Sequence, residues 1–335
     1  MPVALPMEEA SQSGEARRLA VAMARHLGFD EAGQGRVALV VTEAGTNLVK
    51  HAKGGELILR PAGEVLEVLA LDRGPGMADV GRFLVDGVST AGSPGNGLGS
   101  IARHSGPLEI YSLPEAGTAM LIRLAPPPAA GAPAPGAMEL GVVSVPYPGE
   151  SECGDGWSVQ EQDGRTLLLM ADGLGHGPQA AEAAREAIRV FHERADRGPA
   201  EVIRAAQEPM RGTRGAALAI AAVDPIRREV PYAGVGNSSA SIHAPNAARP
   251  VKLVSHNGTV GHERRKVQEF TYPWPPGALL VMHSDGLATH WRLDRYPGLA
   301  ARHPGLVAGV LFRDARRGRD DATVLAARDG TATSG

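Results

Sequence analysis

Apolar and polar positions divide the chain into two parts, each with its own succession of helical and strand-like segments. The first part combines amphipathic helical stretches with short apolar runs bounded by turn residues. We expect helices at residues 13–27, 36–52 and 100–104, and strands at 56–60, 65–71, 109–112 and 118–124. Residues 1–10 are expected to form a disordered or loosely docked tail, Ser13 to cap the first helix, and residues 33–35 to break the helical pattern.

The second part contains more strands than the first. Its short apolar runs predict strands at residues 140–145, 166–171, 216–223, 229–235, 251–254, 278–282 and 324–327. Helical periodicity predicts helices at residues 178–194, 200–210 and 304–317. Many short strands with two or three helices indicate an α+β layered sandwich.

One strand-turn-helix stretch carries the first candidate chemistry. The apolar run at residues 166–171 is typical of a strand buried on both faces, and it ends at the turn Asp172-Gly173. Pro178 fits the first position of the helix that follows. Asp172 is therefore expected at the end of a rigid strand, where a carboxylate beside glycines suits a hard, oxygen-liganded cation.

Three further carboxylates stand in similar surroundings. Asp155 lies between two glycines, Asp285 follows an apolar run, and Asp320 precedes one. Asp-Gly is also an ordinary turn dipeptide, and Asp163-Gly164 is expected to be a simple hairpin turn. If strands of one sheet bring the four carboxylates together, they repel one another unless metal ions neutralise them.

Composition and charge narrow the classes of function. Hydrophobic residues make up 43% of the 335 residues, enough for packed cores, and the net charge of −3 lacks the basic excess of a nucleic-acid binder. The basic run at residues 264–266 is expected to be a solvated loop. No segment resembles a signal peptide or reaches membrane-spanning length, so we expect a soluble, cytoplasmic protein with no membrane partner.

A Pro/Ala/Gly segment marks the predicted domain boundary. The stretch APPPAAGAPAPGA, residues 125–137, cannot continue a helix and has nothing to bury, which is typical of a semi-extended spacer. The sequence therefore predicts a domain at residues 1–124, a linker at 125–138 and a second domain at 139–330.

Four motifs in the first part appear in a fixed order: Glu-x-x-x-Asn on a helix, Asp-x-Gly-x-Gly, Gly-x-Gly-x-Gly at a helix start, and Gly-Thr before a final strand. Together they resemble the Bergerat-type ATP-binding α/β sandwich of the GHKL superfamily, most closely its RsbT/RsbW-type anti-sigma serine kinase branch. The resemblance implies that Glu43 is a base toward the incoming hydroxyl and that Asn47 ligates the Mg²⁺ of ATP. Asp72 would bind the adenine amino group. The other residues of the implied ATP site are Gly74, Gly76, Gly95, Gly97, Gly99 and Thr118. Backbone N–H groups at a helix N-terminus also suit phosphates.

Five motifs in the second part resemble the SpoIIE/RsbX branch of the metal-dependent type-2C protein phosphatases, a β-sandwich flanked by helices. They are Gly-Asp, Asp-Gly-Leu-Gly-His-Gly, Ala-Gly-Val-Gly-Asn, Ser-Asp-Gly-Leu and Asp-Asp-x-Thr. The resemblance implies that Asp172 bridges two Mn²⁺ or Mg²⁺ ions, which activate a water molecule. The implied remaining ligands are Asp155 and the Gly173 carbonyl, with Asp285 and Asp320 on the second ion. Asp321 is a less certain ligand than Asp320.

Three residues near these motifs are expected to play other roles. Leu174 stands where eukaryotic type-2C phosphatases carry a histidine that protonates the leaving group, so the general acid is expected to be a metal-bound water. His176 is expected to cap or pack at the turn. Cys153 is expected to be a small buried apolar residue instead of a redox switch.

Both resemblances together imply a bifunctional regulator of a phosphorylation switch, in which a protein serine/threonine kinase is joined to a phosphoserine/phosphothreonine phosphatase. The implied substrate is a STAS-domain protein, either an anti-sigma antagonist or a stressosome component. Two alternatives stay open. The first domain could bind ATP only as a sensor, or it could sequester a sigma factor while the phosphatase controls release.

Overall fold

The computed structural model describes residues 2–52, 54–84, 97–126, 138–245, 247, 249–262 and 267–330. The chain divides into two compact units, Met1–Ala132 and Pro133–Gly335, which we describe separately. Most of the predicted linker, Gly95 and the basic run at 264–266 lie outside the described residues. None of the helices in the described ranges is long and apolar enough to cross a membrane.

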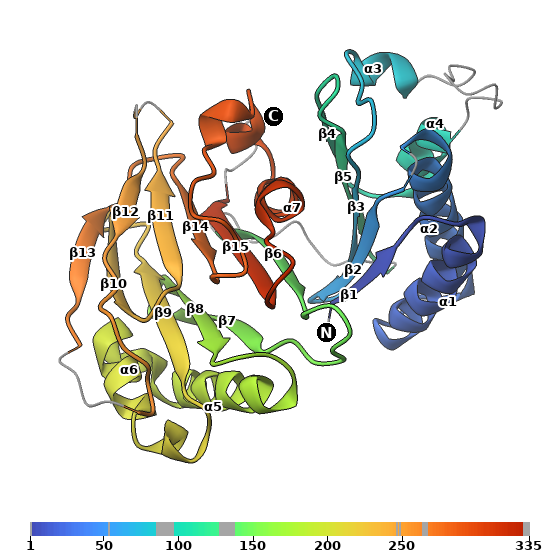
Figure 1. Cartoon of the computed structure of the whole chain (residues 1–335). Coiled ribbons are helices and arrows are strands. Elements are labelled where there is room, and N and C mark those ends of the chain that lie inside the picture. The colour runs from blue at the N-terminus through green and yellow to red at the C-terminus, as the bar shows by residue number, and fades with distance from the viewer. Residues whose placement is uncertain are drawn as a thin grey trace. The chain divides into compact units, whose positions relative to one another are not determined.

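The first unit contains one antiparallel sheet with helices packed on one face (Figure 1). The strands lie in the order β1-β2-β3-β5-β4. Their bounds are β1 Val3–Pro6, β2 Glu56–Ala62, β3 Val65–Leu71, β4 Leu108–Ser112 and β5 Thr118–Leu124, and the helices are α1 Ala10–His26, α2 Glu31–His51, α3 Val80–Phe83 and α4 Gly97–His104. The strands predicted at 65–71 and 118–124 are confirmed residue for residue.

The two long helices begin earlier than the sequence predicted. Gln12 Oε1 accepts a hydrogen bond from the backbone N–H of Glu9 at 2.8 Å, and α1 starts at Ala10, so Ser13 is a buried helical residue and not the cap. Asp30 accepts from the backbone N–H of Gly33 at 2.7 Å, and α2 continues through both glycines. The predicted helix break at residues 33–35 is therefore wrong. A good N-cap contributes about 1 kcal/mol, which is about the cost of one helical glycine.

The N-terminal segment is a strand and not the predicted tail. β1 pairs with β2 from Val3 opposite Leu59 to Pro6 opposite Glu56, and Met7 is completely buried. Pro2 precedes this strand and Pro6 is its last residue, and a sheet edge is where proline is tolerated. Four residues are too few for their alternation to be recognised in the sequence.

The second unit contains two five-stranded antiparallel sheets that pack face to face. The first, called here the β8 sheet, has the order β13-β10-β9-β8-β7, with β13 Phe270–Pro273, β10 Glu229–Val235, β9 Ala216–Val223, β8 Arg165–Gly173 and β7 Asp155–Gln162. The second, called the β14 sheet, has the order β12-β11-β14-β15-β6, with β12 Val251–Leu253, β11 Ser239–His243, β14 Leu279–His283, β15 Ala322–Asp329 and β6 Met138–Val145.

Helices cover the outer faces of this sandwich (Figure 1). Helices α5 (Pro178–Arg194) and α6 (Pro199–Ala206) pack on the β8 sheet, and α7 (Pro304–Ala315) packs on β6 and β15. Short 3₁₀ turns span Ala195–Arg197, Pro209–Gly212, Leu293–Arg295 and Leu299–Ala301. The predicted α+β sandwich is confirmed, and α5 begins at Pro178 as predicted.

Strand β8 is buried on both faces, which explains why the apolar run at residues 166–171 is continuous. Leu168 and Met170 lie in the core between the two sheets, whereas Leu167, Leu169 and Ala171 lie in the core beneath α5 and α6. A strand buried on both faces has no polar alternation. The hairpin turn Asp163-Gly164, also predicted, joins β7 to β8 with both residues at positive φ, 51° and 73°.

Candidate active sites

Asp155 and Asp172 lie opposite each other at one end of the β7–β8 pair, where they are cross-strand partners. Asp172 precedes the turn that leads into α5, and Asp155 is buried, with 8% of its surface exposed. Their placement follows from the sequence, since Asp155 begins one strand and Asp172 lies near the end of its neighbour.

Asp285, Asp320 and Asp321 come from the other sheet. Asp285 follows β14, the adjacent pair precedes β15, and the ends of these two strands are cross-strand neighbours. The expectation that strands of one sheet carry all the carboxylates is therefore wrong. Apolar runs mark strands but do not say which sheet each strand joins.

Hydrogen bonds connect the two groups of aspartates. Ser284 Oγ donates to Asp155 Oδ2 at 2.7 Å, and the backbone N–H of Asp285 donates to Asp172 Oδ2 at 3.4 Å. Asn237 Nδ2 donates to Asp285 Oδ2 at 2.6 Å. The structure thus brings the aspartates of both sheets into one site, called here the acidic cluster: Asp155, Asp172, Asp285, Asp320 and Asp321.

Burial raises the pKa of every carboxyl in the acidic cluster, and repulsion from neighbouring aspartates adds to the shift for all except Asp321. Desolvation is the main cause for Asp172, whose pKa rises to about 7, and repulsion from Asp285 is the next. Desolvation followed by repulsion from Asp172 raises the pKa of Asp155 well above its ordinary value. The pKa values of Asp285, Asp320 and Asp321 are also raised, first by burial. This site disfavours its own negative charge, so bound cations would stabilise it.

The donor set fits hard divalent cations. Asp321 Oδ1 accepts from the backbone N–H of Tyr147 at 2.8 Å, while its buried Oδ2 has no hydrogen-bond partner in the described part of the chain. No group of three or more His, Cys, Asp or Glu side chains in the described ranges has the geometry to hold a metal ion by itself. A site of this kind therefore needs water and backbone carbonyls to complete each ion's coordination, which is the usual state of Mg²⁺ in proteins.

The turn after Asp172 is shaped by close packing. A Cβ on Gly173 would lie 2.3 Å from the carbonyl oxygen of Ala180 in α5, so only glycine fits. Leu174 projects with 55% of its surface exposed. His176 stacks on Tyr147 with ring centroids 4.4 Å apart, and its Nδ1 lies 2.8 Å from Glu150 Oε1, in agreement with the predicted packing role.

Burial also decides the state of Cys153. Desolvation raises the pKa of its thiol well above the ordinary value, and its Sγ lies 3.5 Å from Ser144 Oγ. Because the thiolate is the reactive form, these surroundings agree with the prediction of an unreactive cysteine.

The candidate ATP site of the first unit centres on the start of α4. A Cβ on Gly97 would lie 3.1 Å from Asn47 Oδ1 and 3.2 Å from Glu43 Oε2, so the helix start lies directly against these side chains. Asn47 Nδ2 is buried and has no hydrogen-bond partner among the residues that the structure describes. Gly99 is buried within α4.

Asp72 is held by the backbone. Its Oδ1 accepts from the backbone N–H groups of Gly74 at 2.8 Å and Thr118 at 3.1 Å. A Cβ on Gly76 would lie 1.9 Å from the Leu113 carbonyl oxygen, so this turn packs tightly against the β4–β5 hairpin. Hydrogen bonds thus link Asp72 to Gly74 in the same turn and to Thr118 at the start of β5. Glu43 and Asn47 lie separately, on α2.

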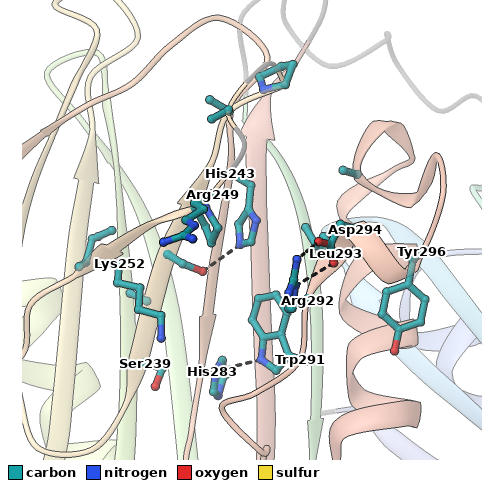
Figure 2. A pocket seen from close by; sticks show the side chains of 18 of the residues that line it. Ser239, His243, Arg249, Lys252, His283, Trp291, Arg292, Leu293, Asp294 and Tyr296 are labelled. Carbon is teal, nitrogen blue, oxygen red and sulfur yellow. Dashed lines mark hydrogen bonds and ion pairs between the residues drawn. The ribbon is translucent and has the colours of Figure 1, made fainter.

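A cavity of about 1230 Å³ lies on the outer face of the β14 sheet, and no residue of the acidic cluster lines it. Figure 2 shows its wall, where Trp291 Nε1 donates to His283 Nε2 at 3.2 Å and His243 stacks on Trp291. His283 is the last residue of β14, two positions before Asp285. The cavity wall therefore helps to fix the strand end that carries Asp285.

Three residues that orient side chains in or beside the acidic cluster were not singled out from the sequence. Ser284 and Asn237 stand inside the recognised motifs, whereas Glu150 orients His176 from a distant loop. The motif positions of Ser284 and Asn237 are a signal that sequence analysis can use. The Glu150 contact depends on the fold alone.

Two helix-flanked sheets with aspartates gathered at one end form the sandwich of the type-2C-like protein phosphatases, and solved chains share this fold. The structure of RsbX in complex with magnesium matches with a TM-score of 0.51 and 21% identity, covering 57% of this chain and 95% of that one. A second solved chain comes from work on the bacterial stressosome, described there as a modular system that has been adapted to control secondary messenger signaling. This second chain matches with a TM-score of 0.54 and 26% identity. It covers 57% of this chain and 100% of that one.

Residues 162–329 match the model of the stage II sporulation protein E (SpoIIE) family, and the chain belongs to this family. Residues 6–122 match the histidine kinase-like ATPase domain. The phosphoserine phosphatase RsbX of Bacillus subtilis (strain 168) is 27% identical over 139 residues, 42% of this chain and 69% of RsbX. The serine/threonine-protein kinase RsbT of the same strain is 30% identical over 107 residues, 31% of this chain and 80% of RsbT.

Proposed function

We propose that residues 139–330 form a metal-dependent phosphoserine/phosphothreonine phosphatase. The observation that carries this proposal is the acidic cluster, in which five aspartates from two sheets meet at one end of a type-2C-like sandwich. Membership of the SpoIIE family and the similarity to the phosphoserine phosphatase RsbX support the same reaction.

We assign the ligands of two Mn²⁺ or Mg²⁺ ions within this cluster. Asp172 would contribute to both ions, Asp155 and the Gly173 carbonyl would hold one, and Asp285 and Asp320 would hold the other. Bound divalent cations supply Lewis-acid charge for the phosphoryl oxygens and lower the pKa of a water molecule. Ser284 and Asn237 orient the carboxylates of Asp155 and Asp285 through their hydrogen bonds. Leu174 has no proton to donate, so no side chain at that position protonates the leaving group.

The test is Mn²⁺-dependent phosphate release from a phosphoseryl peptide by the wild type and by Asp172→Asn. We expect release by the wild type and its loss in the variant. Asp163→Asn is the matched control, because it makes the same change in an exposed hairpin turn of the same unit, where asparagine tolerates positive φ. A wild type inactive with all divalent metals, or an active Asp172→Asn, would contradict the proposal.

We propose that residues 1–124 bind ATP with Mg²⁺ and transfer phosphate to a protein serine or threonine. Glu43 would act as the base, Asn47 as the Mg²⁺ ligand and Asp72 as the adenine contact. The glycine-rich segment, with Gly95 outside the described residues, would hold the phosphates. The position of Gly97 against Glu43 and Asn47, and the similarity to the kinase RsbT, support this assignment.

We infer that the substrate of both units is a STAS-domain protein in the cytoplasm, either an anti-sigma antagonist or a stressosome component. Support comes from the relatives RsbX and RsbT and from the stressosome-related chain of similar fold. Transfer of labelled γ-phosphate to a STAS protein, lost in Glu43→Gln while ATP binding is kept, is the expected result. ATP binding without transfer would favour a sensor, and co-purification of a sigma factor without transfer would favour a scaffold.

A further inference from the structure

We propose that Arg214 binds the phosphoryl group of the phosphorylated substrate beside the Asp172 turn. This inference rests on the proposed phosphatase function. Nothing in the motifs singles out Arg214, because it lies in the short segment that leads into β9.

Strand pairing places Arg214 beside the turn. Asp172 lies opposite Ala217 and Gly173 opposite Ala216 in the β8–β9 ladder. The backbone N–H of Leu174 then donates to the carbonyl of Gly215 at 3.0 Å. The segment before β9 therefore continues alongside the turn beyond the end of both strands.

The Arg214 guanidinium occupies space that a glycine leaves open. A Cβ on Gly175 would lie 2.9 Å from a terminal guanidinium nitrogen of Arg214. Gly175 also has a φ of 88°, which disfavours other residues. Gly175, three residues after Asp172, thus leaves room for the Arg214 side chain against the turn that carries Asp172 and Gly173.

Arg214 is exposed, and no described residue forms a hydrogen bond or ion pair with it. Two other exposed arginines of this unit are paired, whereas Arg317, whose charge acts on Asp285, has no side-chain partner among the described residues. Arg211 lies 3.3 Å from Glu208, and Arg185 lies 2.7 Å from Glu152. Within the described ranges, the Arg214 charge is therefore available to an anion that approaches the turn.

The charge of the site explains why a phosphate would need this arginine. Two divalent cations would leave five ionised aspartates with one net negative charge, and a dianionic phosphoryl group would still be repelled. A guanidinium adds positive charge without competing for the carboxylates, and its planar fork matches two phosphoryl oxygens. The exposed Leu174 at the same turn offers an apolar contact to the rest of the substrate.

The test compares Arg214→Ala and Arg214→Lys with the wild type on an aryl phosphate and on a phosphoseryl peptide, both with Mn²⁺. We expect Arg214→Ala to raise KM about 10- to 100-fold for both substrates, because losing a charge-assisted hydrogen bond usually lowers affinity by about this factor. We expect kcat to change less, Mn²⁺ affinity to stay the same, and Arg214→Lys to fall between the two. Arg211→Ala is the matched control and should behave like the wild type.

Three results would overturn the inference. Unchanged KM in Arg214→Ala would show that the arginine does not bind substrate, and lost Mn²⁺ affinity would show a structural role at the cluster. A raised KM with the peptide alone would place Arg214 against another part of the substrate. If the wild type hydrolyses neither substrate, the phosphatase function itself fails, and this result is distinct from a wild type that is active but insensitive to Arg214.

Discussion

The two units place their carboxylates in opposite electrostatic situations. In the second unit, five aspartates lie together, two of them buried and three half-buried, and their pKa values rise first because each loses water. In the first unit, Asp72 accepts two backbone N–H groups, and Glu43 shares its helix face with an amide, Asn47.

The difference indicates how each site obtains its cations. The acidic cluster concentrates negative charge, so we expect it to bind divalent ions from solution before any substrate arrives. The candidate ATP site has one amide and one carboxylate at the glycine-rich helix start, too little charge to hold Mg²⁺ alone. Its ion would arrive with the triphosphate, whose oxygens supply the remaining ligands.

The largest expected effect is loss of phosphatase activity in Asp285→Asn. Removing one carboxylate from the cluster should lower activity by more than about 100-fold, beyond the effect typical of a residue that only orients a ligand. ATP affinity should not change, because Asp285 belongs to the second unit. Asp294→Asn, a control in an exposed loop of the same unit, should keep full activity. Comparable activity in both variants would remove Asp285 from the site.

The second prediction compares the stability of the second unit with and without Mn²⁺. All three tryptophans, Trp157, Trp274 and Trp291, lie in the second unit, so tryptophan fluorescence follows its unfolding alone. Mn²⁺ at about 100 times the Kd of each of the two proposed sites should raise the free energy of unfolding by about 2.7 kcal/mol per site, or about 5.4 kcal/mol in all. Asp172→Asn should abolish this gain. An equal gain in the variant would mean that Mn²⁺ binds elsewhere.

Ser284→Ala should have an intermediate effect. The variant removes the hydroxyl that donates to Asp155, which is expected to weaken Mn²⁺ binding about tenfold. Ser241→Ala, which changes a serine on β11 that hydrogen-bonds to His243, should leave Mn²⁺ affinity unchanged. Calorimetric titration measures both, and equal affinities would show that the Ser284 hydrogen bond does not orient a ligand.

The smallest effect is expected in the first unit. A methyl group from Gly97→Ala would press on Asn47 and Glu43, and we expect ATP affinity to fall about fivefold, at the low end of overpacking costs. Gly35→Ala is the control, because a Cβ there meets no atom within 4 Å, and it should stabilise α2 by about 0.5–1 kcal/mol. A fall in phosphatase activity in Gly97→Ala would show that the two sites are coupled.

The sequence predicted elements best where one apolar run makes one strand. The strands at 65–71, 118–124, 216–223 and 229–235 have the predicted bounds. Four of the described strands were missed. β1 and β13 have only four residues each, β11 has serines and a histidine on its cavity side, and β7 reads DGWSVQEQ, with few apolar residues.

For the site, the sequence identified residue types but not their arrangement. Asp155, Asp172, Asp285 and Asp320 were chosen from motifs, yet the sheets that carry them were not foreseen, because strand order is a property of the whole fold. Arg214 had no motif to mark it. Its relation to Gly175 exists only once β9 pairs with β8.

The most direct test of this account is the number of Mn²⁺ ions bound per chain without nucleotide, measured by calorimetric titration of the wild type and Asp172→Asn. The account predicts two ions in the wild type and none in the variant, with one further divalent ion bound when ATP is added. Fewer than one ion in the wild type, or equal binding in Asp172→Asn, would contradict the claim that the acidic cluster is a two-metal site.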